Sequence, residues 1–172
     1  QACVGIIVID NYEELMQRAT EEEKLKLTSG IEKKIYAWIN KYNGLAIKSE
    51  RDTYVCIFSQ SEMEKMREEK FEILDEIKEI KTDENIQSTL SIAISEEGDN
   101  NLEKYQSVKA VVDIALGRGG DQAIIKQRKI LFLWWKNTRS RKKDKSKSKN
   151  CFTSIRRNNE WSKQYNHNGT RK

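Results

Sequence analysis

The run Cys3-Val4-Gly5-Ile6-Ile7-Val8-Ile9 decides the fold. It is short, unbroken and rich in β-branched residues, which is typical of a central strand that is buried on both faces of a sheet. The polar pair Asp10-Asn11 ends it. The chain has 172 residues, enough for one ordinary domain with an appendage, because a domain of that size buries a workable core.

The hydrophobic pattern outside this strand predicts alternating helices and strands. Apolar residues at helical spacing predict a long amphipathic helix from about Thr20 to Tyr42, and the polar turn 49–52 joins two strands into a hairpin. The other predicted elements are strands at 45–48, 54–58, 88–95 and 121–126 and helices at 102–116 and 61–80, the latter beginning with a Ser61–Glu64 capping box. The order β-α-β-β-α-β-α-β indicates an α+β, ferredoxin-like sheet with its helices on one side.

The charge of the chain changes sign near residue 127. Residues 1–126 carry 17 Lys and Arg against 25 Asp and Glu, whereas residues 127–172 carry 15 against 2. Runs of like charge are usually solvated, disordered segments. We therefore predict a domain at 1–126 and a basic tail at 127–172 that is unstructured, poorly packed or an irregular helix.

The octapeptide Ala115-Leu116-Gly117-Arg118-Gly119-Gly120-Asp121-Gln122 precedes the last predicted strand. With the element order, the first strand at 4–12 and the strand at 90–94, it resembles the GGDEF family, which has a nucleotide-cyclase fold. Within that family it is similar to the cyclic-di-AMP phosphodiesterases of the GdpP (YybT) type. The resemblance covers residues 1 to about 126. It implies a regulatory, cytoplasmic domain of a phosphodiesterase at the cell membrane, here a fragment without the manganese-dependent DHH hydrolase domain.

The resemblance also implies which groups an active diguanylate cyclase needs, and several are missing. The metal-binding Asp of the first strand corresponds to Val8. The GGDEF signature reads Glu50-Arg51-Asp52-Thr53-Tyr54, so long charged side chains replace both glycines that let the backbone approach phosphate. The product-inhibition motif RxxD becomes Lys41-Tyr42-Asn43-Gly44. This pattern predicts no catalytic residues and no cyclase activity.

The phosphate clamp of the family is degenerate as well. Its motif AKxxGRN falls on residues 115–121, with Leu116 in place of Lys and Gly120 in place of Arg. Arg118 is the cationic residue that remains in this segment. Weak nucleotide binding is therefore the alternative function.

Four residues are candidates for weak nucleotide binding: Asp10, Asn11, Asp52 and Arg118. Asp10 and Asp52 follow or precede adjoining strands and would hold one divalent ion, Mg²⁺ or Mn²⁺ with ATP, in a weak ATPase. In the alternative, both carboxylates only stabilise turns. Besides a nucleotide, the expected partners are the other domains of the parent phosphodiesterase and a second copy in a homodimer.

The tail departs from the family in a way that a shifted reading frame explains. The family continues after GGDQ with a segment resembling FFGGKT and a basic linker, whereas residues 132–137 read FLWWKN. Because Trp has the single codon TGG, reading Trp134-Trp135-Lys136 one base later forces Gly-Gly, and allowed codons give FFGGKT and then the linker. Residues 165–169 permit Ile-Ile-Ile-Met-Gly, which resembles the strand that opens the DHH domain. We expect a frameshift near residues 126–131.

The competing interpretation is a binding arm for nucleic acid or anionic lipid. Clustered Lys and Arg at 138–149 would contact phosphates, and Trp134, Trp135 and Trp161 would stack or anchor. The acidic first part of the chain argues against nucleic acid as a partner.

Overall fold

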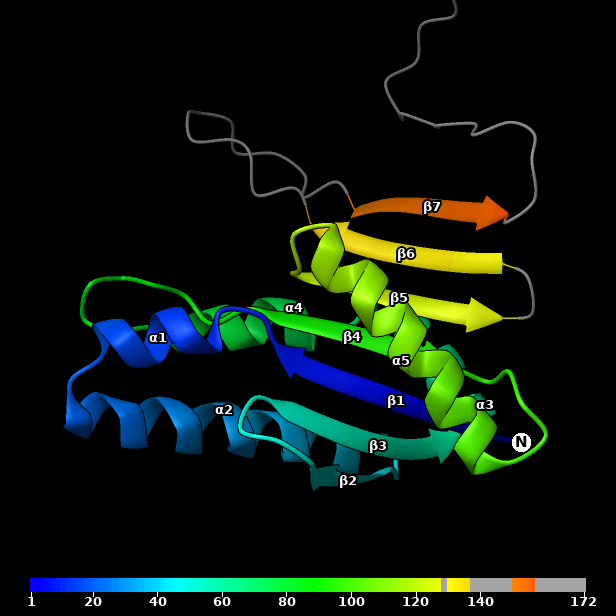
Figure 1. The fold of residues 1–172 in the computed structure, drawn as a ribbon, viewed down its shortest axis with the longest axis horizontal. Coiled ribbons are helices and arrows are strands. Elements are labelled where there is room, and N and C mark those ends of the chain that lie inside the picture. The colour runs from blue at the N-terminus through cyan, green and yellow to red at the C-terminus, as the bar shows by residue number, and fades with distance from the viewer. Residues whose placement is uncertain (128–129, 137–149, 157–172) are drawn as a thin grey trace, which may run out of the picture.

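The computed structural model describes residues 1–127, 130–136 and 150–156, with side chains through Gln127 and at 131–134. It contains one seven-stranded mixed sheet in the order β2-β3-β1-β4-β5-β6-β7 (Figure 1). The strands are β1 (Ala2–Ile9), β2 (Leu45–Lys48), β3 (Thr53–Ser59), β4 (Leu90–Ser95), β5 (Gln122–Gln127), β6 (Ile130–Lys136) and β7 (Asn150–Arg156). The helices are α1 (Tyr12–Arg18), α2 (Glu21–Lys41), α3 (Gln60–Glu68), α4 (Ile73–Glu76) with the 3₁₀ turn η1 (Ile77–Glu79), and α5 (Asn101–Gly117). The predicted α+β class is confirmed.

Strand β1 lies at the centre of the first part of the sheet, as its sequence predicts. It pairs antiparallel with β3 and with β4, and β4 pairs in parallel with β5. The parallel pair needs a crossover connection, and α5 supplies it.

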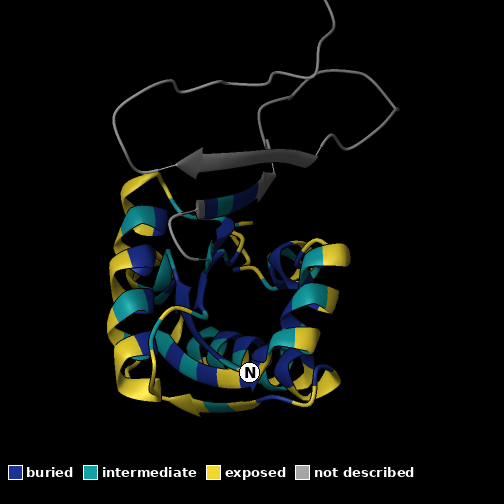
Figure 2. Ribbon diagram, turned by 90° about the vertical axis from the view of Figure 1, so that its right-hand side faces the viewer, coloured by how far each residue is buried: buried dark blue, intermediate teal, exposed yellow. Residues whose placement is uncertain are grey.

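Helices cover both faces of the sheet, so the expectation of helices on one side was wrong. Helix α5 packs on one face, and α2, α3 and α4 pack on the other, as the end-on view in Figure 2 shows. The two faces form two hydrophobic clusters, with Ile7 in one and Val8 in the other. A strand that is apolar at every position has two faces to bury, and a single layer of helices covers only one.

The helix boundaries follow local capping rules in some places and tertiary packing in others. Thr20 caps α2 in a capping box with Glu23, which confirms the long predicted helix. The predicted helix 61–80 is broken, because Lys70 and Phe71 adopt positive φ angles of 58° and 51°. The Ser61 cap was also wrong: Ser59 accepts the hydrogen bond from the backbone of Glu62. Helix α1 was not predicted.

The sheet continues past Lys126, where the basic tail was expected to begin. Strand β6 pairs antiparallel with β5, and β7 pairs with β6. Leu131 and Leu133 are buried in the cluster under α5, whereas Trp134 packs on the other face with its ring centroid 5.4 Å from that of Phe71. Both faces of β6 are covered, which suits its unbroken apolar sequence.

The proposed role of Trp134 as an exposed anchor was wrong, because its side chain is only 8% exposed. The side chains of Trp135 and Trp161 and the basic run 138–149 lie outside the described residues. Within the described ranges, no helix has both the length and the apolar character required to cross a bilayer.

Candidate nucleotide site

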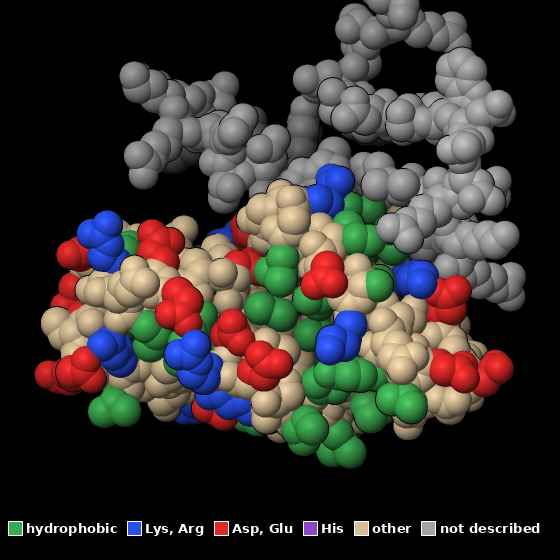
Figure 3. Space-filling view, viewed as in Figure 1, with side chains coloured by type: hydrophobic (Ala, Val, Ile, Leu, Met, Phe, Trp, Pro, Cys, Tyr) green, Lys and Arg blue, Asp and Glu red, His purple; other side chains and the backbone are tan. Residues whose placement is uncertain are grey.

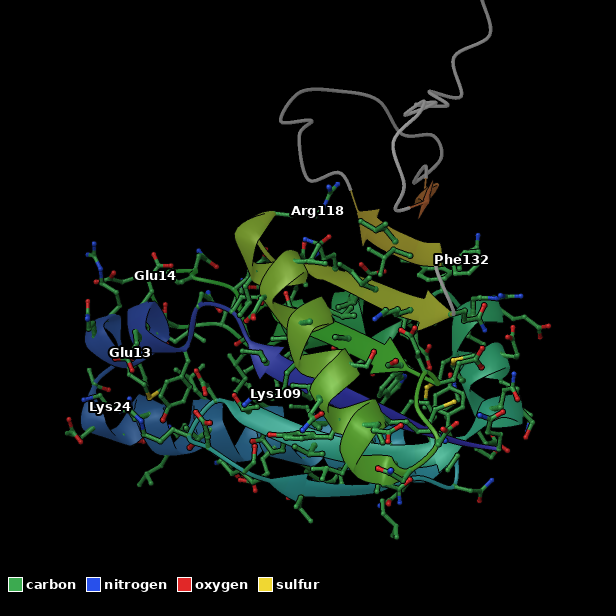
Figure 4. The ribbon with its side chains drawn as sticks, turned by 45° about the vertical axis from the view of Figure 1, so that its right-hand side comes forward. Glu13, Glu14, Lys24, Lys109, Arg118 and Phe132 are labelled. Carbon is green, nitrogen blue, oxygen red and sulfur yellow. The ribbon has the colours of Figure 1, made fainter. Side chains whose placement is uncertain are left out.

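The degenerate signature lies where the sequence predicts it, in the hairpin between β2 and β3. The backbone amides of Ser49 and Glu50 donate to the carbonyl of Thr53 at 2.9 and 3.2 Å and close the turn. Arg51 extends to α1, where its Nη2 lies 2.9 Å from Oε1 of Glu13. Figure 4 labels Glu13 on this helix. The turn is therefore held by its own backbone and by an ion pair with α1.

The register of the sheet shows what surrounds Val8, the residue that the resemblance places at the metal-binding Asp of the first strand. Val8 on β1 lies directly opposite Thr53 on β3, and directly opposite Ser91 on β4. Directly opposite residues of antiparallel strands share one face of the sheet. Val8 is buried in the cluster under α5, and the hydroxyl of Thr53 donates to Oδ1 of Asp52 at 2.9 Å. At this position β1 contributes an apolar side chain, so the Asp52 carboxylate beside Thr53 has no acidic partner from Val8 with which to share a cation.

The GGDQ turn links the end of α5 to β5 and depends on its glycines. The amide of Gly120 donates to the carbonyl of Ala115 at 3.1 Å, and φ is +101° at Gly119 and +71° at Gly120. A Cβ atom on Gly120 would lie 2.6 Å from Cγ of Asp10. Glycine is required here by the backbone conformation and by the close approach of that carboxylate.

The carboxylate of Asp10 holds this turn against the end of β1. Its Oδ2 accepts a 2.7 Å hydrogen bond from the backbone amide of Asp121. The carboxylate of Asp121 in turn pairs with Nζ of Lys78 at 2.6 Å. All three side chains come from different parts of the chain, so this cluster fixes β1, η1 and the GGDQ turn relative to one another.

Burial dominates the electrostatics of the cluster. It raises the pKa of Asp10 above its usual range, although the nearby Ser91 hydroxyl and the hydrogen bond from the Asp121 amide act in the opposite direction. Burial also raises the pKa of Asp121, against the lowering effect of Lys78. In both carboxyl groups Oδ1 is buried, with no hydrogen-bond partner among the described residues. Folding therefore favours the protonated forms of these two acids.

The four predicted nucleotide-binding residues do not share one set of contacts. Asn11 accepts from the Thr89 amide at 3.1 Å and donates to the Gln87 carbonyl at 2.8 Å, so it fixes the entry to β4. Asp10 is engaged with Asp121, and Asp52 accepts from Thr53. Arg118 is exposed at the outer end of α5 (Figure 4), and no described residue forms an ion pair with it.

The metal site at Asp10 and Asp52 stays a prediction. Within the part of the chain that the structure describes, no group of three or more His, Cys, Asp or Glu side chains is placed to hold a metal ion. Sequence reasoning missed the partnership of Asp10 with Asp121 and Lys78. The GGD string gave a signal for Asp121, whereas Lys78 lies among other charges with no distinguishing pattern.

We expect Asp10→Asn to gain stability relative to the wild type as the pH rises. A carboxyl group whose pKa is raised by folding contributes stability that is fully present below its unfolded pKa and is lost as the pH rises through the folded pKa. Asn lacks this titration and still accepts the Asp121 amide. Urea midpoints at pH 4 and pH 7 check this, with the exposed Asp113→Asn as control. A pH-independent difference would contradict the buried carboxylate.

Comparisons of the sequence with known proteins all point to one family. Residues 7–130 match the family described as "Cyclic-di-AMP phosphodiesterase GdpP-like, GGDEF domain". The cyclic-di-AMP phosphodiesterase PdeA of Listeria monocytogenes is 31% identical over 123 residues, and GdpP of Geobacillus thermodenitrificans is 32% identical over 124. In each case the match covers 72% of this chain and 19% of the relative. The chain thus spans about a fifth of the length of these relatives.

Solved structures agree on the fold. The active GGEEF domain of a diguanylate cyclase from Vibrio cholerae superposes with a TM-score of 0.62 at 15% identity, over 74% of this chain and 85% of that domain. The GGDEF domain of DgcB from Caulobacter crescentus, in complex with c-di-GMP, gives 0.59 at 13% identity, over 72% and 77%. At these identities the likeness concerns the fold alone.

Proposed function

This chain belongs to the family of GGDEF domains of GdpP-like cyclic-di-AMP phosphodiesterases, and on that basis we propose that it is a regulatory module that has lost cyclase chemistry. In the proposal, the complete protein is a membrane-bound phosphodiesterase of cyclic-di-AMP. This module lies on the cytoplasmic side and acts on a separate DHH-type hydrolase domain. The similarity to the cyclic-di-AMP phosphodiesterases PdeA and GdpP supports the substrate class.

The observation that carries the loss of cyclase chemistry is the pairing of Val8 with Thr53. Cyclisation of GTP requires cations that position the triphosphate, and cations of this kind bind carboxylate oxygens. The buried valine supplies no negative charge, so the Asp52 carboxylate, which accepts from Thr53, has no carboxylate from the Val8 position with which to share a cation. Leu116 and Gly120 add to the deficit, because neither supplies a cation to a phosphate group.

A weak ATPase is the second candidate, and Arg118 is the observation that favours it. Its guanidinium is exposed beside the GGDQ turn and has no ion-pair partner among the described residues, so it is available to a phosphate. Asp10 and Asp52 would hold Mg²⁺ or Mn²⁺ in this reading. Phosphate release from ATP by the whole chain, compared with an Arg118→Ala variant, discriminates between the two functions. Failure to bind ATP at millimolar concentration removes the ATPase.

An exchange of domains in a full-length relative tests the regulatory role. Residues 7–130 replace the matching stretch of PdeA from Listeria monocytogenes, and a second form lacks that stretch. We expect the exchanged form to hydrolyse cyclic-di-AMP as the intact enzyme does, and the form without the stretch to differ in rate. Equal rates in all three forms would remove the regulatory role.

We also propose that the tail is read out of frame from a point near residues 126–131. The codon pattern around Trp134-Trp135 supports this, and the family match ends at residue 130. The DNA of the source locus tests it. An expected result is a downstream DHH domain in the shifted frame; one intact frame, with relatives that share Trp134-Trp135, would contradict it.

A further inference from the structure

Exposed apolar side chains gather on one face of the β2–β3 hairpin. Leu45 is 78% exposed, Ile47 67% and Ile57 40%. They share a face because Leu45 lies opposite Ile57 and Ile47 lies opposite Val55. Figure 3 shows hydrophobic side chains gathered along this lower margin of the molecule. An exposed apolar group of this kind marks an interaction surface.

The same face continues inward beneath α5. Val4 lies opposite Ile57 and Ile6 lies opposite Val55, and both β1 residues are buried in the cluster that α5 covers. The hairpin is therefore the uncovered outer part of an apolar row whose inner part belongs to the core. A partner molecule that extends this apolar row outward would contact β2 first.

Strand β2 is also the free edge of the sheet. It pairs with β3 on one side, and no described element lies beyond it in the sheet order or in the end-on view of Figure 2. An unpaired edge presents backbone donors and acceptors to a further strand.

Two common protections of such an edge, an outward lysine and a proline, are missing in β2. The chain contains no Pro. Lys48, the one charged residue of β2, is turned to the opposite face, where its Nζ lies 3.6 Å from Oε2 of Glu32 and 5.6 Å from the centroid of the Tyr54 ring. Natural edge strands often carry a lysine or proline that prevents pairing, and here the lysine is engaged elsewhere.

The sequence of β2 is complementary to itself. An antiparallel pair of two copies, centred on Ala46, places Leu45 opposite Ile47 of the other copy, Ala46 opposite Ala46, and Lys48 opposite Gly44. Opposite residues share a face, so the apolar row runs from one copy into the next and no like charges meet. A shift by one residue in either direction would place the apolar rows of the two copies on opposite faces of the joined sheet and is disfavoured. The match of this strand to itself points to a second copy as the occupant.

We propose that two copies of this chain associate through β2, in a two-fold symmetric antiparallel pairing centred on Ala46. The two sheets then form one continuous sheet, and Leu45 and Ile47 of each copy pack laterally against Ile47 and Leu45 of the other copy. Such an interface uses the same patch on both copies. The strand is short, so the interface is small and the dimer is weak. The dimer does not depend on the function proposed above.

Sedimentation velocity of the whole chain in reducing buffer tests the dimer with three variants. Leu45→Lys/Ile47→Lys brings two pairs of like charges face to face, and we expect it to weaken dimerisation by about tenfold or more. Leu45→Lys/Ile47→Glu places each introduced lysine opposite an introduced glutamate of the other copy and should keep the dimer. Leu25→Lys, at a residue of α2 that is 74% exposed, is the control and should change nothing.

Each result decides the proposal. A wild-type chain that stays monomeric at about 500 µM overturns it, since weak interfaces are populated at that concentration. A dimer that survives Leu45→Lys/Ile47→Lys overturns it as well. Equal loss in both double variants overturns the Ala46-centred register. Circular dichroism confirms that each variant is folded, which is expected because positions 45 and 47 are exposed.

Discussion

A chain that ends at Lys126 should lose several kcal/mol of stability relative to the whole chain. The truncation removes β6, and with it the buried side chains of Leu131, Leu133 and Trp134. Burying a large apolar side chain contributes roughly 1.5–3 kcal/mol, and a whole domain is stable by only about 5–15 kcal/mol. The cut also exposes the edge of β5, which favours aggregation. We expect the truncated chain to be unfolded or insoluble.

Urea denaturation followed by circular dichroism measures this loss. A second truncation that ends at Lys136 keeps β6 and serves as the matched control, and it should retain most of the stability. A chain ending at Lys126 that is as stable as the whole chain would contradict the packing of β6 against Phe71 and under α5.

The second large effect is expected for Gly5→Ala in the middle of β1. A Cβ atom at this position would lie 2.7 Å from Sγ of Cys56, 3.3 Å from the ring of Phe58 and 3.4 Å from the carbonyl oxygen of Ala93. Strands β3 and β4 hold β1 on both sides, so it cannot move away. Overpacking of this kind costs about 1–3 kcal/mol.

A double-mutant cycle separates this clash from other effects. Cys56→Ala removes the sulfur atom that meets the new methyl group, so Gly5→Ala should cost much less in the Cys56→Ala background, with a coupling energy of about 1 kcal/mol or more. Gly117→Ala is the control: a Cβ there would contact nothing within 4 Å, and it should be neutral or slightly stabilising. If the losses of unfolding free energy from Gly5→Ala and Cys56→Ala simply add in the double variant, the contact between the new methyl group and the Cys56 sulfur is absent.

Elements with a strong local pattern were predicted well, and those fixed by distant contacts were not. β1 and α2 follow from an unbroken β-branched run and from helical spacing after the Thr20 cap. The break after α3 depends on Phe71, which turns at positive φ to pack against Trp38 and Trp134. No local sequence pattern predicts such a turn. The apolar run that forms β6 was assigned to the basic tail, because basic residues follow it in the sequence.

In the candidate site, too, features set by local sequence were predicted and features set by distant contacts were not. The signature hairpin and the GGDQ turn were located from sequence because each is a contiguous string. The partner of Asp10 was not, since Asp121 lies 111 positions away and meets it only when β1 and β5 flank β4. The unbroken apolar sequence of β1 did imply two covered faces, and applying the same inference to the whole sheet would have placed α5 opposite α2.

With Val8 opposite Thr53, β1 supplies no carboxylate to a cation, and we propose that the cations needed for GTP cyclisation are not held there. The most direct test incubates the whole purified chain with GTP and either Mg²⁺ or Mn²⁺, and quantifies cyclic-di-GMP by mass spectrometry. The active GGEEF domain from Vibrio cholerae serves as the positive control. We predict no product above the protein-free reaction; cyclic-di-GMP that accumulates in proportion to this chain would contradict the account.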